Sequence, residues 1–193
     1  MQKLAQSDLY TLEAYARERA AMRTRVIAHK RQRTLHLGAH LTLLFEDRLT
    51  IQYQVQEMLR IERIFEAAAI QDELDSYNPL IPDGTNLKAT LLIEYTDPDE
   101  RALRLVELHG IERRITLTVG ELAPVVAIAD EDLERSTDKK TSAVHFLRFE
   151  FSPAHIAAFT RGADAMLSVE HPAYRERVTI TPETCAVLAA DFD

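Results

Sequence analysis

Two side chains stand out because each places a chemically active group inside an apolar pattern. Glu62 lies at the centre of an apolar stripe on a predicted helix of about residues 50–65. A carboxylate there must be paired, hydrogen-bonded or protonated, because an isolated buried charge is too costly. His145 shares one face of a predicted strand with Leu147 and Phe149. Imidazole in such a position suits proton transfer or metal ligation.

Arg23 is the predicted partner of Glu62. It lies inside the apolar stripe of a predicted first helix, about residues 9–28, so packing of the two helices would bring Arg23 against Glu62. One interpretation is a buried ion pair that fixes the register of the helices, and the other is a ligand or metal pocket. His145 has the same two interpretations: a core histidine bonded to backbone, or a functional imidazole.

A third candidate is the run His171-Pro-Ala-Tyr174, which places an imidazole and a phenol at a predicted chain reversal. Loop residues often carry function. Tyr174 can equally staple the turn, so both interpretations stay open. The enzyme hypothesis is that Arg23, Glu62, His145, His171 and Tyr174 converge on one pocket.

Glycine and cysteine are scarce, and their scarcity excludes several functional classes. The five glycines are all isolated, so the sequence has neither a dinucleotide-binding glycine motif nor a P-loop. The single cysteine, Cys185, can form neither an intramolecular disulfide nor a thiolate cluster. No H-E-x-x-H zinc motif is present. We predict no cofactor; iron or zinc would have to be bound by scattered His and Glu side chains.

Charge is distributed unevenly along the chain. The net charge is -8, whereas residues 1–40 carry eight basic and three acidic side chains. The acidic total argues against nucleic-acid binding. The basic segment is instead a candidate docking surface for an acidic protein. Its docking candidates are Arg25, Lys30, Arg31 and Arg33.

No apolar run is long enough to cross a bilayer, and residues 1–8 lack the apolar segment of a signal peptide. We therefore expect a cytoplasmic protein that does not insert into membranes.

The order of predicted elements indicates an α+β fold with a helical amino-terminal third and a largely antiparallel sheet. We expect one compact domain over residues 1–193, helix-rich at about 1–80 and sheet-rich at about 85–193. Asp97-Pro98, Ser152-Pro153 and Thr181-Pro182 are typical helix starts. The strands are predicted near 34–37, 40–46, 87–95, 114–119, 125–129, 143–151, 165–170 and 175–180.

Four runs resemble a bacterial family known only as a domain of unknown function, and the resemblance spans the whole chain. The runs are residues 54–64, 74–82, 141–149 and 171–174. Members of that family are commonly encoded beside a rubrerythrin and a cysteine-rich iron–sulfur oxidoreductase. The resemblance therefore implies, by association, a role near peroxide defence or redox metabolism. Three of the four runs contain Glu62, His145, or His171 with Tyr174.

The leading hypothesis is a non-enzymatic accessory protein of a redox system, which contacts a metalloprotein partner through a charged surface. The alternative is a small-molecule or metal-binding enzyme with a pocket around Glu62 and His145. A third hypothesis is a homo-oligomeric scaffold in which these residues are structural.

Overall fold

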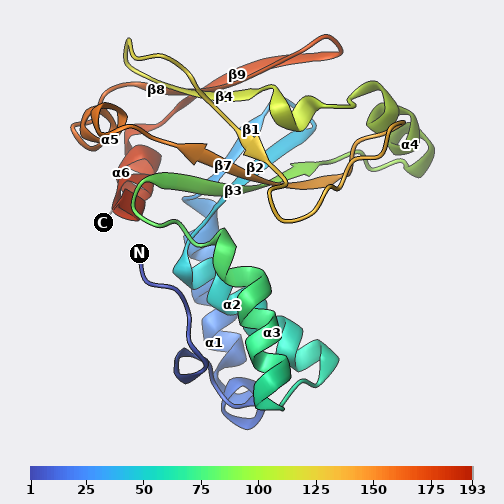
Figure 1. The fold of residues 1–193 in the computed structure, drawn as a ribbon, viewed down its shortest axis with the longest axis vertical. Coiled ribbons are helices and arrows are strands. Elements are labelled where there is room, and N and C mark those ends of the chain that lie inside the picture. Colours follow the sequence, from blue (N-terminus) through green and yellow to red (C-terminus); the bar gives the residue numbers. More distant parts are fainter. Residues whose placement is uncertain (193) are drawn as a thin grey trace.

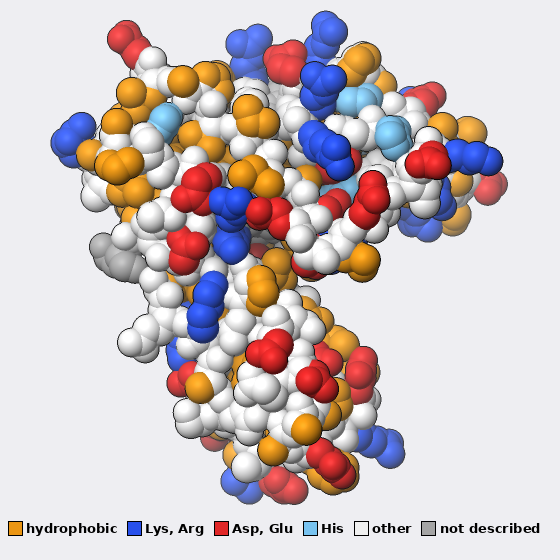
Figure 2. All heavy atoms as spheres, viewed as in Figure 1, with side chains coloured by type: hydrophobic (Ala, Val, Ile, Leu, Met, Phe, Trp, Pro, Cys, Tyr) orange, Lys and Arg blue, Asp and Glu red, His pale blue; other side chains and the backbone are white. Residues whose placement is uncertain are grey.

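A computed structural model describes residues 1–192, and it confirms the α+β fold (Figure 1). Three helices form a projecting helical part: α1 (Leu12–Arg31), α2 (Arg48–Glu62) and α3 (Ala67–Tyr77). The remaining helices lie against the sheets: α4 (Pro98–Glu107), α5 (Pro153–Thr160) and α6 (Pro182–Ala189). A narrow waist separates the helical part from the sheet part (Figure 2).

The helices begin where capping chemistry predicts them. Asp97, Ser152 and Thr181 each accept a backbone N–H from the first turn, and a proline follows each of them at the first helical position. The first helix differs from the prediction. Thr11 caps it, so the helix begins at Leu12 and not near residue 9. It also extends beyond residue 28, to Arg31. Short 3-10 turns complete the set: η1 (Gln6–Asp8), η2 (Asn78–Leu80), η3 (Ile111–Arg113) and η4 (Ala190–Phe192).

Two antiparallel sheets make up the rest of the fold. The five-stranded sheet has the order β1-β2-β3-β7-β6, and the four-stranded sheet has the order β5-β4-β8-β9. The strands of the first are β1 (Thr34–Leu37), β2 (Leu41–Glu46), β3 (Asn86–Ile93), β7 (Val144–Glu150) and β6 (Ile128–Ala129). Those of the second are β5 (Val125–Val126), β4 (Ile115–Val119), β8 (Ala165–His171) and β9 (Tyr174–Ile180).

One apolar core fills the space between the two sheets. The predicted strand at 125–129 is in fact divided. Its first half, β5, pairs with β4, whereas its second half, β6, pairs with β7. Because side chains alternate along each strand, Leu147 and Phe149 of β7 point into this core together with His145. Val144, Phe146 and other residues in alternate positions lie on the outer face.

The helical part has small apolar clusters of its own, and their composition corrects the predicted stripes. Helix α1 buries Tyr15, Met22 and Val26. Helix α2 buries Ile51, Val55 and Leu59, at spacings of four. The apolar stripe predicted for this helix continues to Ile61 and Phe65, but these two side chains are 62% and 72% exposed, so the buried stripe is shorter than predicted.

An ion pair does join α1 to α2, but its members are Arg19 and Glu57. The Arg19 guanidinium donates to both Glu57 carboxylate oxygens, at 2.7 and 2.8 Å. The Tyr15 hydroxyl donates to the same carboxylate at 2.7 Å. These bonds hold the pKa of Glu57 at about 2, mainly through Arg19. The sequence reasoning predicted the kind of contact correctly and its position wrongly.

Arg33 joins the helical part to the sheet part. Its side chain is 2% exposed, so the prediction that it docks a partner is wrong. It donates to the backbone oxygen of Phe45 at 3.0 Å and to the carboxylate of Asp191, in η4. Asp47, the N-cap of α2, lies 3.5 Å away and also contacts His29 at 2.5 Å. Three segments distant in sequence therefore meet at one guanidinium.

The carboxylates at this junction are not fully compensated. Burial raises the pKa of Asp191 to about 6, although the charge of Arg33 acts in the opposite direction. Among residues 1–192, the second carboxylate oxygen of Asp191 and Oε2 of Glu46 are buried without a hydrogen-bond partner. The junction therefore has a stability that depends on pH.

We predict that Asp191→Asn removes a pH-dependent loss of stability. Because the folded pKa of Asp191 exceeds the ordinary value of 3.8, folded protein retains a proton that unfolded protein loses. The contribution of Asp191 to the free energy of unfolding is therefore largest below about pH 4 and falls as pH rises through about 6. Relative to the Asn variant, the wild type should lose about 3 kcal/mol between these limits.

The measurement is urea denaturation of both proteins from pH 4 to pH 7. Asp138→Asn, at an exposed position, serves as the control and should give a curve parallel to the wild type. Parallel curves for Asp191→Asn as well would contradict the prediction.

Candidate functional site

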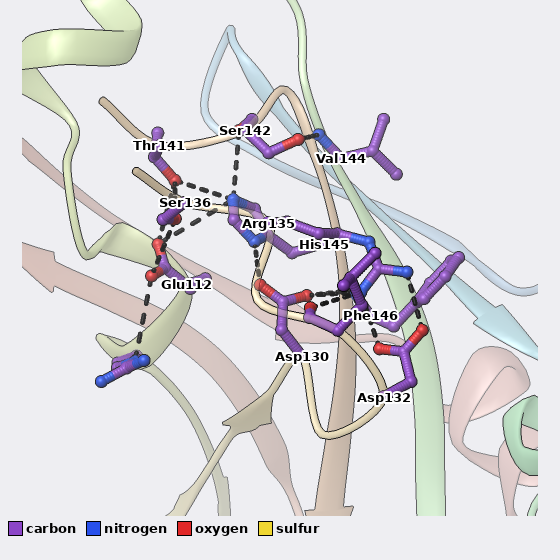
Figure 3. Close-up of polar contacts among 12 residues, drawn as sticks. Glu112, Asp130, Asp132, Arg135, Ser136, Thr141, Ser142, Val144, His145 and Phe146 are labelled. Carbon is purple, nitrogen blue, oxygen red and sulfur yellow. Dashed lines mark hydrogen bonds and ion pairs between the residues drawn. The ribbon is translucent and has the colours of Figure 1, made fainter. Parts of the chain in front are cut away.

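A group of buried polar residues surrounds His145 (Figure 3). The imidazole is fully buried, with 0% exposure. Its Nδ1 lies 2.6 Å from Oδ2 of Asp130, and its Nε2 lies 2.7 Å from the Thr141 hydroxyl and 3.1 Å from the Ser142 backbone oxygen. Glu112 is at 3.9 Å from Nε2. The predicted backbone partner is present, and two carboxylates accompany it.

The hydrogen bonds occupy both ring nitrogens of this imidazole. Nδ1 faces the carboxylate of Asp130, and Nε2 lies between the Thr141 hydroxyl and the Ser142 backbone oxygen. The Thr141 hydroxyl also contacts Glu112, at 3.1 Å. The buried imidazole therefore has protein partners on both sides, and the carboxylates of Asp130 and Glu112 lie within 4 Å of the ring.

The two carboxylates are themselves anchored. Asp130 accepts the backbone N–H of Phe146 at 3.1 Å and lies 3.4 Å from the guanidinium of Arg135. Arg135 also forms a two-point contact with Asp132 and packs over the Phe146 ring at 4.3 Å. Asp130 has a left-handed backbone with φ of 52°, a conformation that Asp adopts more readily than most residues.

This network joins the two ends of a surface loop. Asp130 begins the segment between β6 and β7, Thr141 and Ser142 end it, and all three contact the same imidazole (Figure 3). Compact loops whose ends lie close together are frequently functional. His145 therefore holds the two ends of the loop of residues 131–140 together, and we call this arrangement the clamp.

Sequence reasoning missed Asp130, Thr141 and Glu112. One signal was available for the first two, since Asp130 opens the polar loop and Thr141 opens the run that contains His145. Glu112 lies in η3, a one-turn element with no recognisable sequence pattern. Its carboxylate could be found only from the fold.

Arg23 and Glu62 do not take part in this site. Both are exposed on the helical part, on α1 and at the end of α2. Among the described residues, Arg23 and Glu62 form no hydrogen bond or ion pair with each other. On α1 the buried face is a different one from the predicted stripe, with Tyr15, Met22 and Val26. On α2 the predicted stripe is buried only as far as Leu59, and Glu62 is the last residue of the helix. The pocket shared by Glu62 and His145 is therefore not formed.

The other docking candidates on α1 remain at the surface. Arg25 and Arg31 are exposed, and Lys30 is half-buried near the end of the helix. Over residues 1–192, none of the three has a carboxylate within 4 Å. Only Arg33 of the original four is removed from the surface.

His171 and Tyr174 form the two ends of the β8–β9 hairpin turn and pair with each other. Nε2 of His171 contacts the backbone oxygen of His109 at 3.1 Å, and its Nδ1 accepts the Ala173 N–H at 3.2 Å. Both ring nitrogens are thus used by backbone. The sequence alternative in which the motif staples the turn agrees with these contacts.

The Tyr174 hydroxyl ties two hairpins together. It donates to the backbone oxygen of Leu37 at 2.8 Å and accepts the His40 N–H at 3.1 Å. Between these residues Gly38 has φ of 73°, and a Cβ there would lie 2.4 Å from the Tyr174 oxygen. Glycine is therefore required by both backbone conformation and space.

The chemistry available around His145 is limited by its hydrogen bonds. Thr141, His145 and Asp130 have the spacing of a nucleophile, a base and an orienting carboxylate. However, the imidazole is fully buried and both of its ring nitrogens are bonded within the protein, so a substrate does not reach it in this arrangement. Residues 1–192 contain no group of three His, Cys, Asp or Glu that could hold a metal ion. Cys185 is buried, and burial raises the pKa of its thiol.

Comparison with known proteins gives the family. The model of the family described as "Protein of unknown function (DUF3501)" matches residues 3–192. The chain belongs to this family. It is also similar to a solved structure described as a novel protein of unknown function from Burkholderia pseudomallei K96243, with 53% identity, full coverage of both chains and a TM-score of 0.95. No curated protein matches the chain. Within the described residues, no helix is both long and apolar enough to span a membrane.

We predict that His145→Ala destabilises the protein by about 3 kcal/mol, because it leaves the Asp130 carboxylate and the buried Thr141 hydroxyl without their shared partner. Amide exchange should accelerate first in residues 130–142. Urea denaturation and hydrogen exchange measure the two effects. His36→Ala replaces an exposed histidine and should change stability by less than about 0.5 kcal/mol. Similar exchange acceleration throughout the sheets, with no preference for the loop, would contradict the clamp assignment.

Tyr174→Phe should cost about 1–2 kcal/mol, since it leaves the Leu37 carbonyl and the His40 N–H without their partner. Thermal and urea denaturation provide the measurement. Tyr10→Phe is the matched control, because Tyr10 is 42% exposed and its loss of a hydroxyl should be close to neutral. Equal effects of the two changes would show that the hydroxyl does not join the hairpins.

Proposed function

We propose that this protein is a non-enzymatic accessory protein that acts by binding another protein. The observation that supports this most is the closure of the His145 network. Its chemically versatile groups are buried and bonded to one another, so they stabilise the fold and are unavailable to a substrate. Binding through the surface is then the function that the exposed charges favour.

The docking surface is proposed to lie on the outward face of α1. Arg17, Arg25 and Arg31 are exposed there, and none has a carboxylate within 4 Å among the described residues. Arg19, by contrast, is already neutralised by Glu57. Cations without internal partners suit an acidic surface, which they attract at long range and orient on approach.

The partner is proposed to be an acidic metalloprotein of a cytoplasmic redox or peroxide-defence system. The family resemblance implies two named candidates, a rubrerythrin and a cysteine-rich iron–sulfur oxidoreductase. In such a system the partner would supply the redox centre, because Cys185 is the only cysteine and is buried. The accessory protein would bind and orient this partner through the positive charges of α1.

A titration tests the proposal. The purified protein is titrated at low ionic strength with each of the two candidates, and binding is followed by calorimetry. We expect association with at least one of them. Arg25→Glu combined with Arg31→Glu should weaken it by about tenfold or more, and added salt should reduce the wild-type affinity.

The matched control is Arg161→Glu combined with Arg177→Glu. These arginines are also exposed and unpaired in the described chain, but they lie on α5's carboxyl end and on β9. The control should bind like the wild type. Absence of binding at low ionic strength, or equal losses in both double variants, would overturn the docking assignment.

A further inference from the structure

A cavity of about 270 Å³ lies where three segments of the chain meet. Leu80 of η2 forms one wall, and Glu131 of the clamped loop forms another. The floor is the outer face of the five-stranded sheet, with Lys88 of β3 and Phe146 and Arg148 of β7. Sites between separate structural parts are common positions for ligands. Charged side chains of both signs intermingle on the sheet part just above the waist (Figure 2).

Two cations lie side by side in this cavity. Lys88 and Arg148 are direct partners in the pairing of β3 with β7. Like charges at opposed positions destabilise a sheet unless anions compensate them. Arg148 is compensated, since its guanidinium bonds to Glu131 at 2.7 Å and also contacts Glu150.

Lys88 is not compensated in the same way. Its ammonium donates to the backbone oxygen of Pro79, and no carboxylate of residues 1–192 lies within 4 Å of it. Burial lowers the pKa of Lys88, and the charge of Arg148 lowers it further. The carboxylates of Asp83, Glu131 and Glu150 act in the opposite direction without restoring the ordinary value. On its other side Lys88 is opposite the buried Glu46 of β2, whose carboxylate is more than 4 Å from the ammonium, and the charge of Lys3 also acts on it. Lys88 thus retains two ammonium hydrogens that no carboxylate of residues 1–192 accepts.

The rest of the lining is apolar except for Asp132, whose carboxylate is already paired with Arg135. The ring of Phe146 and the side chain of Leu80 border the cavity. Arg135 packs over the Phe146 ring at 4.3 Å, which fixes the ring in the floor. An apolar surface beside a single available cation matches a ligand that has a flat apolar body and one negative group.

We propose that this cavity binds a small organic anion, a carboxylate carried on a flat apolar body. The carboxylate would accept hydrogen bonds from the Lys88 ammonium, and the apolar body would rest against Phe146 and Leu80. This site goes beyond partner docking, because it uses none of the α1 cations.

The clamp at His145 gives the site its shape. Glu131 follows Asp130 directly, so the imidazole that holds Asp130 also sets the position of the loop wall. A bound anion would contact the helical part, the sheet and the loop at once. Binding should therefore order the loop as well as fill the cavity.

Three probes with the same ring system separate charge from apolar contact: 2-naphthoate, 2-naphthamide and 2-naphthylmethylammonium. Binding to the wild type is measured by calorimetry and mapped by amide chemical shifts. We expect 2-naphthoate to bind at least about tenfold more tightly than the amide, a ratio typical of one charged hydrogen bond. The ammonium probe should be the weakest. The shifts should concentrate at Leu80, Lys88, Glu131 and Phe146.

The proposal predicts opposite changes in 2-naphthoate affinity for two variants. Lys88→Met keeps the length of the side chain and should weaken 2-naphthoate by about tenfold, with little effect on the amide. Glu131→Gln removes a competing anion and should strengthen 2-naphthoate several-fold. Lys139→Met, at an exposed loop position, is the control and should bind like the wild type. Denaturation curves establish that each variant is folded.

The proposal is overturned if 2-naphthoate and 2-naphthamide bind equally, if Lys88→Met leaves 2-naphthoate binding unchanged, or if no probe binds. A gain in affinity at Glu131→Gln cannot arise from loss of structure, so it tests the site even if Lys88→Met is unstable. Raising pH until Lys88 loses its proton should also weaken 2-naphthoate, because the favourable charge then disappears.

Discussion

The buried guanidinium of Arg33 is the constraint on which the arrangement of the two parts depends. It follows α1, contacts the cap of α2 and bonds to a carboxylate of η4. A guanidinium that is only 2% exposed is tolerated only with such a set of acceptors. Removal of one partner leaves a buried charge without compensation, which lowers the stability of the fold. Arg33 therefore joins the helical part to the sheet part, in addition to the apolar clusters that each part has of its own.

His145 has a similar structural role elsewhere in the molecule. Its buried imidazole joins the two ends of a loop, whereas Arg33 joins two parts of the fold. In both cases one buried side chain bonds to groups from segments that are distant in sequence, which makes the geometry specific. His145, which could take part in catalysis judged by its residue type alone, thus holds the fold together. The docking cations of α1 and Lys88 have no carboxylate within 4 Å among the described residues, and both proposals rest on these cations.

The sequence was sufficient for the fold class and for most helix starts, because capping residues such as Asp97 and Thr181 act locally. It also identified His145 as a buried histidine. It failed at the carboxyl end of α2. The helix ends at Glu62 with Arg63 in a left-handed conformation, so Phe65 lies beyond it. Val55 and Leu59 of the predicted stripe are buried, whereas Ile61 and Phe65 are exposed. It could not anticipate contacts set only by topology, such as Glu112 with Thr141 or Lys88 with Arg148.

The division of residues 125–129 between the two sheets couples the sheets to each other. Only Ala127 separates β5 from β6, and β5 pairs with β4 whereas β6 pairs with β7. A change in the distance between the sheets would have to break one of these short pairings as well as open the shared apolar core. The loop between β6 and β7 begins where this shared segment ends, and Glu131 of that loop lines the Lys88 cavity. A ligand in the cavity would therefore lie beside the end of the one segment that pairs with both sheets.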